Sequence, residues 1–391
     1  MSDGVLIAGA GPVGLTCALA LARHGIAVTV LERGDTLSTA SRASTFHPGT
    51  LDLLEPLGVV PELTAAGRLV SHIQWRDLTG TVLAAMDFAV LQGLTRHPYR
   101  LHAEQSTLTR LLAAALLALP GTRLLTGHEV RDVITAPGSV RIRATTRAGT
   151  SEFTGRFLVA ADGAHSSVRT ALGVDFPGED YPHYALRVIT GTPLDEKVPG
   201  LAPLAYIRDV RQSFSVLGLR DHWRLIFRIP AGIDAGDAVR PDAVRDLVRR
   251  ALPQTDVRID DAHTYRVSRR VLERYRHGTV FFAGDAAHLT STAGGLNMNC
   301  GLHDAADLAE TLTALLRGDG NPDEHADRWA ERRRAALVGT VLPLSEARAR
   351  GADGGDPRAA VAEVARTAAD PALTRHYLAR SSLLPALSAT A

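Results

Sequence analysis

The sequence predicts an α/β protein in which a parallel-sheet domain is interrupted by an antiparallel sheet and followed by a helical C-terminal segment. Three observations support this fold class. A glycine-rich turn joins an apolar strand to a helix at the amino terminus. Further apolar runs end in Asp-Gly or Gly-Asp later in the chain, and the segment between these two runs alternates apolar and polar residues. Continuous apolar runs are typical of buried parallel strands, and alternation is typical of antiparallel strands with one exposed face.

The amino-terminal turn indicates a dinucleotide site. Residues 5–8 form an aliphatic run, and Gly9-x-Gly11-x-x-Gly14 then opens a helix that we expect to end near Arg23. The first glycine permits the tight turn, the second lets a pyrophosphate approach the backbone, and the third lets the helix pack closely on the strand. The phosphate would lie at the amino end of the helix, where free N–H groups point outward.

A second predicted strand, residues 27–31, ends in Glu32. This carboxylate stands roughly 20 residues beyond the glycines, where a ribose diol needs an acceptor. Strand, glycine turn, helix and acid together favour a Rossmann-type dinucleotide site over an ordinary glycine turn, which is the alternative.

Composition excludes several classes of function. The chain has 391 residues, 45% of them hydrophobic, and a formal net charge of +1, which argues against nucleic acid or an anionic membrane as the main partner. No apolar run approaches the roughly 18 residues of a membrane span, and no signal peptide is visible, so we expect a cytoplasmic protein. Cys17 and Cys300 have no metal-type spacing and are expected to be packing residues, so no metal site is predicted. Lys197 is the only lysine.

The alternating and apolar segments divide the chain into domains. Short alternating segments between 185 and 230, and a helix from 241 to 252, indicate an inserted substrate domain. The predicted division is 1–70 for the first part of the nucleotide domain, 71–98 for a hairpin of the substrate domain, 99–175 for the second part, 176–275 for the substrate domain, and 276–391 for the third part with the C-terminal helices.

Two loop residues are candidates for contact with the dinucleotide. Arg42 lies in a polar loop ahead of a short predicted helix, and Gln105 lies near the start of the next one. Arg42 would contact a phosphate or the ribityl chain, and Gln105 would offer an amide. A solvated loop arginine and an ordinary surface turn are the alternatives.

Two later apolar runs end in acids. The run 157–161 precedes Asp162-Gly163, and the run 279–283 precedes Gly284-Asp285. Ligands of open α/β sheets bind beyond the carboxyl ends of parallel strands, so both carboxylates are candidates for a binding role. Asp162 could instead pair with Arg169 to hold its turn.

Taken together, the three motifs resemble those of the class A FAD-dependent aromatic monooxygenases, the para-hydroxybenzoate hydroxylase family, over essentially the whole chain. The resemblance implies a Rossmann-type FAD-binding domain, FAD as cofactor, NAD(P)H as transient co-substrate, and an aromatic small molecule and O2 as the other partners of a monomer or homodimer. The residues implied in cofactor binding are Gly9, Gly11, Pro12, Val13, Gly14, Glu32, Arg33, Arg42, Gln105, Val130, Asp162, Asp285, Gly295, Leu296, Asn297 and Met298.

The stretch around Leu296 departs from the family twice. Relatives usually carry proline where this chain has Thr292, and glycine where it has Asn297. We expect a helix to begin near Leu296 and to direct its free N–H groups at the ring edge where negative charge collects on reduction. Asparagine tolerates a left-handed backbone better than most residues, so the family's turn is expected to survive at Asn297.

The implied reaction has three steps: NAD(P)H reduces the flavin, dioxygen adds at C4a, and the hydroperoxide transfers an oxygen atom to an electron-rich ring. The protein would exclude water and favour the substrate phenolate. The predicted catalytic residues are Tyr206, Arg211 and Thr292, with Arg208 and His222 as further candidates. An ordinary structural role is the alternative for each of them.

The same fold allows three rival functions. Flavin-dependent halogenases carry a tryptophan-rich strand and a lysine near the peroxide, whereas the comparable stretch here is residues 225–230, Leu-Ile-Phe-Arg-Ile-Pro, with no lysine. An oxidase or reductase on the same fold would insert no oxygen, and a non-catalytic FAD-binding protein would show no turnover.

Overall fold

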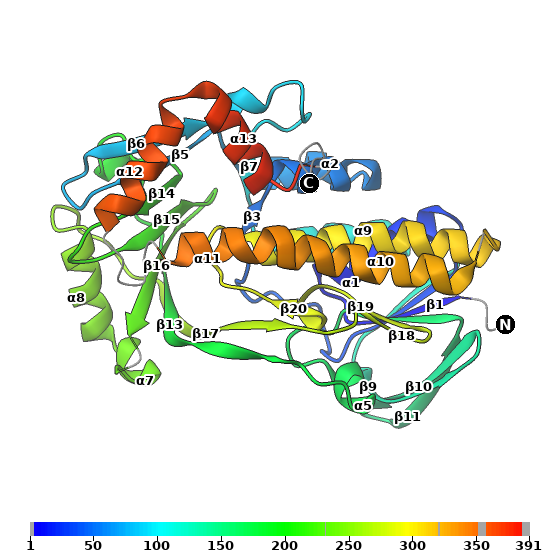
Figure 1. Cartoon of the computed structure of the whole chain (residues 1–391). Coiled ribbons are helices and arrows are strands. Elements are labelled where there is room, and N and C mark those ends of the chain that lie inside the picture. The colour runs from blue at the N-terminus through cyan, green and yellow to red at the C-terminus, as the bar shows by residue number, and fades with distance from the viewer. Residues whose placement is uncertain (1–3, 231, 320, 351–356, 385–391) are drawn as a thin grey trace.

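Two large β-sheets with covering helices form the body of the protein, in a computed structural model that describes residues 4–384 apart from 231, 320 and 351–356 (Figure 1). The long helices α9 (Leu296–Arg317) and α10 (Pro322–Ala336) run side by side over the six-stranded sheet, and the eight-stranded sheet lies beside it.

The six-stranded sheet is the parallel core that the sequence predicts. Its strand order is β18-β19-β12-β1-β2-β8, with only the edge strand β18 antiparallel to its neighbour. Because parallel strands end at one edge, the sequence motifs that follow β1, β2, β12 and β19 meet there. The strands are β1 (Val5–Ala8), β2 (Val28–Leu31), β8 (Thr122–Leu125), β12 (Phe157–Ala160), β18 (Arg276–His277) and β19 (Val280–Phe282).

Helix α1 lies at the centre of the helical layer of this domain and contacts both α4 and α9. Its apolar residues belong to the largest buried cluster of the described chain, together with those of the central strands. The helix runs from Pro12 to Arg23, as predicted, because Pro12 suits the first turn and Gly25, at a φ of 79°, follows its end. The other helices of this layer are α4 (Gln105–Leu117), α9 (Leu296–Arg317) and α10 (Pro322–Ala336).

Smaller elements complete this domain. One three-stranded sheet, β11-β10-β9, is an antiparallel meander, and another has the order β3-β7-β4. The elements are β3 (Thr45–Phe46), α2 (Pro48–Leu54), η1 (Glu55–Leu57), α3 (Val60–Ala66), β4 (Arg68–Val70), β7 (Arg100–His102), β9 (Glu129–Ala136), β10 (Ser139–Thr146), β11 (Gly149–Gly155), α5 (Ser167–Ala171) and η3 (Gly284–Ala286).

The eight-stranded sheet has the order β20-β17-β13-β16-β15-β14-β5-β6, so the hairpin 71–98 and the segment 176–275 share one sheet. The predicted antiparallel pairing holds except between β14 and β5, which are parallel because a long excursion through the nucleotide domain separates them in the chain. The elements are β5 (His72–Arg76), β6 (Val82–Asp87), β13 (Gly178–Thr190), α6 (Leu194–Lys197), β14 (Leu204–Ile207), β15 (Phe214–Gly218), β16 (Trp223–Pro230), α7 (Ala235–Ala238), α8 (Pro241–Ala251), β17 (Asp261–Val271) and β20 (His288–Leu289).

The C-terminal helices do not stay with the parallel sheet. Helix α10 continues through a π-helical turn, η4 (Leu337–Val341), into α11 (Leu342–Arg350). The next two helices pack against β6 and the short helix η2 (Phe88–Leu91), where Leu378 and Leu384 join a buried cluster with Trp75. These helices are α12 (Pro357–Ala368) and α13 (Pro371–Ser381). Residues 357–384 therefore pack on the eight-stranded sheet, whereas the predicted division placed them with the nucleotide domain.

Candidate functional site

One cavity of about 1590 Å3 extends from the carboxyl edge of the parallel sheet to the eight-stranded sheet. This volume exceeds the roughly 300–1,000 Å3 of a typical single-ligand pocket, so the cavity has room for a large ligand and a second, smaller one. Fifteen of the sixteen residues that the sequence suggested for cofactor binding line it, and Gly14 lies behind the lining in helix α1.

The glycine turn has the geometry of a pyrophosphate site. Gly9 has a φ of 98°, and a Cβ there would lie 2.4 Å from the carbonyl oxygen of Ala161. A Cβ on Gly14 would lie 2.0 Å from the carbonyl oxygen of Gly9, so helix and strand are in close contact. By contrast, a Cβ on Gly11 would meet nothing within 4 Å, because this position faces the open cavity at the amino end of α1. The turn therefore leaves space for an anion where the helix N–H groups are free.

Glu32 lies beside this turn. Its Oε2 accepts a hydrogen bond of 2.8 Å from the backbone N–H of Ala10, and its Oε1 accepts one of 2.9 Å from that of Gly34. Each carboxylate oxygen can accept further hydrogen bonds, so the group is held in position and can still bind hydroxyls. Arg33 follows at the exposed rim of the cavity.

Asp162 is anchored by the start of α5. Its Oδ2 accepts hydrogen bonds from Ser167 Oγ at 3.2 Å and from the N–H of Val168 at 3.1 Å, while its buried Oδ1 has no partner. Arg169 forms no ion pair with Asp162; it donates instead to the carbonyl oxygens of Ala164 and Ala286. The unpartnered oxygen of Asp162 is a polar group that a bound cofactor would satisfy.

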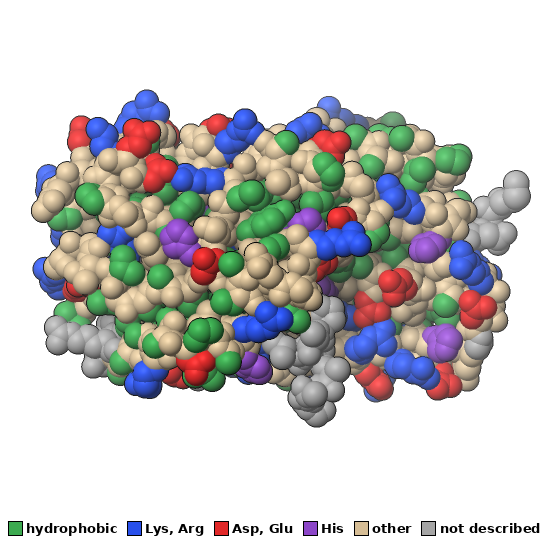
Figure 2. Space-filling model, turned by 90° about the horizontal axis from the view of Figure 1, so that it is seen from above, with side chains coloured by type: hydrophobic (Ala, Val, Ile, Leu, Met, Phe, Trp, Pro, Cys, Tyr) green, Lys and Arg blue, Asp and Glu red, His purple; other side chains and the backbone are tan. Residues whose placement is uncertain are grey.

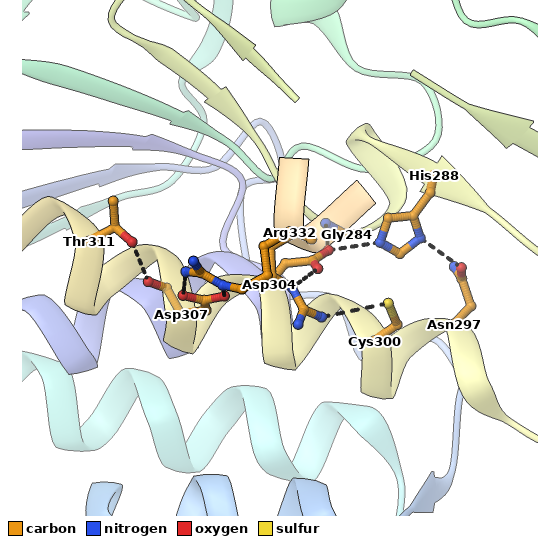
Figure 3. Close-up of polar contacts among 9 residues, drawn as sticks. Gly284, His288, Asn297, Cys300, Asp304, Asp307, Thr311 and Arg332 are labelled. Carbon is orange, nitrogen blue, oxygen red and sulfur yellow. Dashed lines mark hydrogen bonds and ion pairs between the residues drawn. The ribbon is translucent and has the colours of Figure 1, made fainter. Parts of the chain in front are cut away.

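Asp285 is the outer end of a buried polar chain, and the inner part of this chain, from Asn297 through His288 to Asp304, is shown in Figure 3. Its Oδ1 accepts a hydrogen bond of 2.7 Å from Asn297 Nδ2, and Asn297 Oδ1 lies 3.1 Å from Nδ1 of His288. On its other side His288 Nε2 lies 2.8 Å from Asp304 Oδ2, and Asp304 Oδ1 accepts from Arg333 Nε at 2.8 Å. Both ring nitrogens of His288 face acceptors, which requires a doubly protonated imidazolium and fixes the direction of every hydrogen bond in the chain.

The charges of this network agree with its geometry. Burial raises the pKa of Asp304, but the charges of Arg333 and His288 outweigh it and bring that pKa down to about 2. Burial lowers the pKa of His288, but the neighbouring Cys300 and Asp304 raise it well above its ordinary value. For Asp285, burial dominates and its pKa is raised, although the charges of His288 and Arg42 act against this.

His288, Cys300 and Asp304 also bring three possible metal-ligating atoms together, all buried. Arg333 already supplies the positive charge that a metal ion would bring to these three residues, because its Nε donates to Asp304 and its Nη2 lies 4.0 Å from Cys300 Sγ. This arrangement fits an ion-pair network better than a metal site.

The loop before α9 borders the middle of the cavity. Gly294 and Gly295 have φ angles of 86° and 65°, and α9 begins at Leu296, as predicted. Asn297 lies within the first helical turn, so the expectation of a left-handed backbone there is wrong and the two glycines carry the turn. Asn299 is buried and donates to the carbonyl oxygens of Thr45 and Gly295, which fixes the loop against β3. The free N–H groups of α9 point toward the cavity.

The predicted catalytic residues divide into two groups. Tyr206 and Thr292 line the cavity, and Thr292 lies in polar contact with the half-buried Tyr265. Arg211 does not reach the cavity lining, because its side chain is 68% exposed and pairs with Asp209 at 3.1 Å. His222 pairs with Glu104 at 3.3 Å and also lies outside the lining, whereas Arg208 lines it.

Sequence reasoning missed two arginines beside Tyr206. Arg100, from β7, and Arg348, from α11, line the same part of the cavity. Burial raises the pKa of Tyr206, but Arg348, Arg100 and Arg208 outweigh it, so this pKa lies below its ordinary value. No local sequence signal marks either residue, because the chain brings them together from segments about 250 residues apart.

The comparisons decide the family. A family model described as "FAD binding domain" matches residues 3–340. The chain belongs to this family. It is 31% identical over 349 residues to para-nitrophenol 4-monooxygenase from Pseudomonas sp. (strain WBC-3), an alignment that covers 88% of this chain and 86% of that relative.

Solved structures agree with this assignment. The crystal structure of p-nitrophenol 4-monooxygenase from Pseudomonas putida DLL-E4 superposes with a TM-score of 0.91 at 26% identity, covering 97% of this chain and 98% of that one. A ternary complex of aklavinone-11 hydroxylase with FAD and aklavinone gives a TM-score of 0.80 at 26% identity, covering 92% and 71%. The predicted membership of the class A flavoprotein aromatic monooxygenase family and the predicted fold class are confirmed.

The surface and the helices provide two further observations. On the face shown in Figure 2, basic and acidic side chains are interspersed and not gathered by sign, which agrees with the net charge of +1. Within the described parts of the chain, none of the helices combines the length and the apolar character that a membrane crossing requires.

Proposed function

We propose that this protein is an FAD-dependent monooxygenase that uses NAD(P)H and O2 to hydroxylate an aromatic or phenolic small molecule. The observation that carries the proposal is the continuity of this cavity, because both the glycine fingerprint and Tyr206 with its arginines line it. The names of the relatives support it, since para-nitrophenol 4-monooxygenase aligns over most of both chains.

The cavity lining fits FAD along its length. The pyrophosphate would lie at Gly11 and the amino end of α1, and the adenosine ribose would lie at Glu32. Asp285 and the unpartnered Oδ1 of Asp162 would accept hydrogen bonds from hydroxyls of the cofactor. The start of α9, residues 295–298, would donate backbone hydrogen bonds to the ring. When bound, FAD would accept a hydride from NAD(P)H and would activate O2 for the transfer of one oxygen atom.

Tyr206 is the residue best placed to handle the substrate proton. Its side chain is buried, lines the cavity and has a lowered pKa, so Tyr206 gives up its own proton to solvent more readily than an ordinary tyrosine, and the resulting tyrosinate Oη can then accept the proton of a substrate phenol. The phenolate that results is the more electron-rich form of the ring. The guanidinium groups nearby stabilise negative charge on either oxygen.

Thr292 and Tyr265 border the space between the loop and the eight-stranded sheet. Burial raises the pKa of Tyr265, so its hydroxyl keeps its proton and its contact with Thr292 orients the threonine hydroxyl. We propose that this pair limits access of water to the reacting atoms.

The test begins with the FAD-loaded protein and its visible spectrum. NADPH or NADH is added without oxygen, air is then admitted, and the cycle is repeated with a panel of phenols that starts with p-nitrophenol. We expect bleaching, recovery of the yellow colour in air, and faster NAD(P)H consumption with at least one phenol. A protein that does not retain FAD after reconstitution would contradict the proposal, and reduction without any phenol effect would favour an oxidase or a binding protein on this fold.

A further inference from the structure

The ring of His47 bridges two segments that lie far apart in the sequence. His47 is fully buried at the amino end of α2. Its Nδ1 lies 2.9 Å from the carbonyl oxygen of Ser381, at the end of α13, and its Nε2 lies 3.0 Å from that of Gly294, in the loop before α9. Its backbone N–H donates to Oδ1 of Asn299 at 3.0 Å, so the main chain of His47 is held as well. The C-terminal helix and the loop therefore meet at this one imidazole ring.

The loop before α9 depends on contacts of this kind. Gly294 and Gly295 both have positive φ angles, and glycine, which has no Cβ, has little conformational preference of its own. The peptide group between them is planar and trans, so its C=O and N–H point in opposite directions. The C=O meets His47 Nε2, and the N–H donates to the carbonyl oxygen of Thr292 at 3.2 Å. A hydrogen bond from His47 therefore orients the turn that carries Thr292 into the cavity lining and leads into α9.

One proton on the ring cannot satisfy both carbonyl groups. Both ring nitrogens face acceptors, and a neutral imidazole has only one N–H group. Burial and the positive charges of Arg100 on β7 and Arg348 on α11 lower the pKa of His47 well below its ordinary value, although the two carbonyl groups act against this. At this residue α9 and α13 contribute neutral groups, the amide of Asn299 and the carbonyl of Ser381. Without a nearby negative charge the ring is therefore neutral, and it donates to only one of the two carbonyl oxygens.

A negative charge at the start of α9 changes this balance. The loop and the first turn of α9 are the segment that we assign to the flavin ring, and the free N–H groups of that turn favour an anionic reduced flavin. We infer that His47 takes up a proton from solvent when the bound flavin is reduced, and that its second N–H then fixes the loop 292–295 against the end of α13. His47 is then a positioning residue, which acts through the loop. The inference rests on the proposed function for the identity of the cofactor.

The number of protons taken up on reduction tests this inference. Two electrons and one proton convert oxidised flavin into its anionic reduced form, so protonation of His47 adds a second proton. The number follows from the dependence of the flavin reduction potential on pH, measured at about pH 6, near the ordinary pKa of histidine. We expect nearly two protons per two electrons in the wild-type protein and one in His47→Gln, because an amide donates a hydrogen bond but gains no proton. A wild-type value of one overturns the inference, whether or not the variant folds.

His376→Gln is the matched control. His376 is exposed on α13, so this variant should take up as many protons as the wild-type protein. If His47→Gln is less stable but still takes up nearly two protons, His47 has only a structural role and the inference is overturned. Two protons in every variant, together with the absorption spectrum of a neutral reduced flavin, would place the second proton on the flavin and overturn it too.

Hydrogen exchange of the loop tests the positioning role. The N–H of Gly295 is bonded within the turn, so its exchange rate reports how firmly the turn is held. Reduction with dithionite should slow this exchange by about fivefold in the wild-type protein, the effect of one additional hydrogen bond, and should not change it in His47→Gln. Exchange that does not respond to reduction in the wild-type protein overturns the positioning role.

Failure of the proposed function looks different. Neither the proton count nor the exchange measurement uses NAD(P)H or a phenol. A protein that gives the expected result in both, and yet hydroxylates no aromatic compound, would contradict the proposed function and leave the role of His47 standing.

Discussion

Asn297 Nδ2 donates a hydrogen bond of 2.7 Å to Oδ1 of Asp285. This bond links the carboxylate of the Gly-Asp motif to the buried imidazolium of His288, because the same amide accepts from the ring through its Oδ1. The resemblance described above leads us to expect glycine at position 297, and glycine has no side chain with which to make this contact to Asp285.

Asn297→Gly should therefore weaken FAD binding. The variant removes the donor that orients Asp285, and loss of one hydrogen bond to a charged group corresponds to about 1.5–3 kcal/mol, or roughly 10- to 150-fold in the dissociation constant. Titration of the apoprotein with FAD measures it. Asn321→Ala is the matched control: it removes the N-cap of α10, which binds the N–H of Asp323, and should lower stability by ~1 kcal/mol with FAD affinity intact. Unchanged FAD affinity in Asn297→Gly would show that Asp285 needs no support.

The glycine fingerprint offers a pair of variants that separates binding from folding. Gly11 has a φ of −76° and open space where a Cβ would be, so Gly11→Ala should fold normally and lose at least tenfold in FAD affinity because the methyl group enters the phosphate site. Gly14→Ala places its methyl group against the carbonyl oxygen of Gly9 and should destabilise the protein by about 1–3 kcal/mol. Thermal unfolding and FAD titration of both variants check this. FAD affinity that is intact in Gly11→Ala would place the pyrophosphate elsewhere.

Because Asp304 and His288 form a buried ion pair, we expect the free energy of unfolding to decrease at acidic pH. The folded-state pKa of Asp304 is about 2, below its ordinary value of about 3.9. A carboxylate with a lowered pKa stabilises the fold above the ordinary value, and this contribution is lost as the pH falls from about 4 to 2. The loss should be on the order of 2 kcal/mol. The raised pKa of His288 has the opposite sign: its contribution is complete below its ordinary pKa, persists at neutral pH, and is lost only at higher pH.

Urea unfolding of Asp304→Asn between pH 2.5 and 7 tests this. The variant breaks a buried ion pair, so we expect a loss of about 3–5 kcal/mol at pH 7 and a weaker dependence on pH below 4. Asp307→Asn is the control. Asp307 lies on α9 one turn after Asp304 and forms an ion pair with Arg332 of α10 nearer the surface, so this substitution should cost only about 0–1 kcal/mol of stability. Equal losses in the two variants would argue against the network.

Tyr206→Phe should impair turnover and spare the cofactor. If Tyr206 takes the proton of a substrate phenol, its removal should lower kcat by about 10²- to 10⁴-fold. The flavin spectrum and the rate of anaerobic reduction without substrate should not change. Tyr184→Phe, on β13 and outside the cavity lining, is the control. If the Tyr206→Phe variant kept the full kcat, another group would have to accept the proton of the substrate phenol.

The sequence predicted the parts of the site that depend on short segments. Each of Gly9, Glu32, Asp162 and Asp285 follows a strand of the parallel sheet, and one local pattern was enough to place each at the same edge. The start of α9 at Leu296 was predicted for the same reason. Local patterns also indicated the strands of the inserted sheet, although not the parallel pairing of β14 with β5.

The substrate side could not be predicted in this way. Arg211 was a predicted catalytic residue, but its neighbour Asp209 holds it at the surface. Arg100, on β7, and Arg348, on α11, lie beside Tyr206 through a contact between segments distant in sequence. No periodicity encodes such a contact, so three-dimensional structure was needed to find it.

The measurement that tests the central claim most directly is the mass of the aromatic product formed under ¹⁸O2 with NAD(P)H and the FAD-loaded protein. A monooxygenase places one atom of dioxygen in the product and reduces the other to water, so we predict a gain of one ¹⁸O per hydroxylation. A product that forms without ¹⁸O, or takes its oxygen from H2¹⁸O, would contradict the account and assign the cavity to an oxidase or reductase.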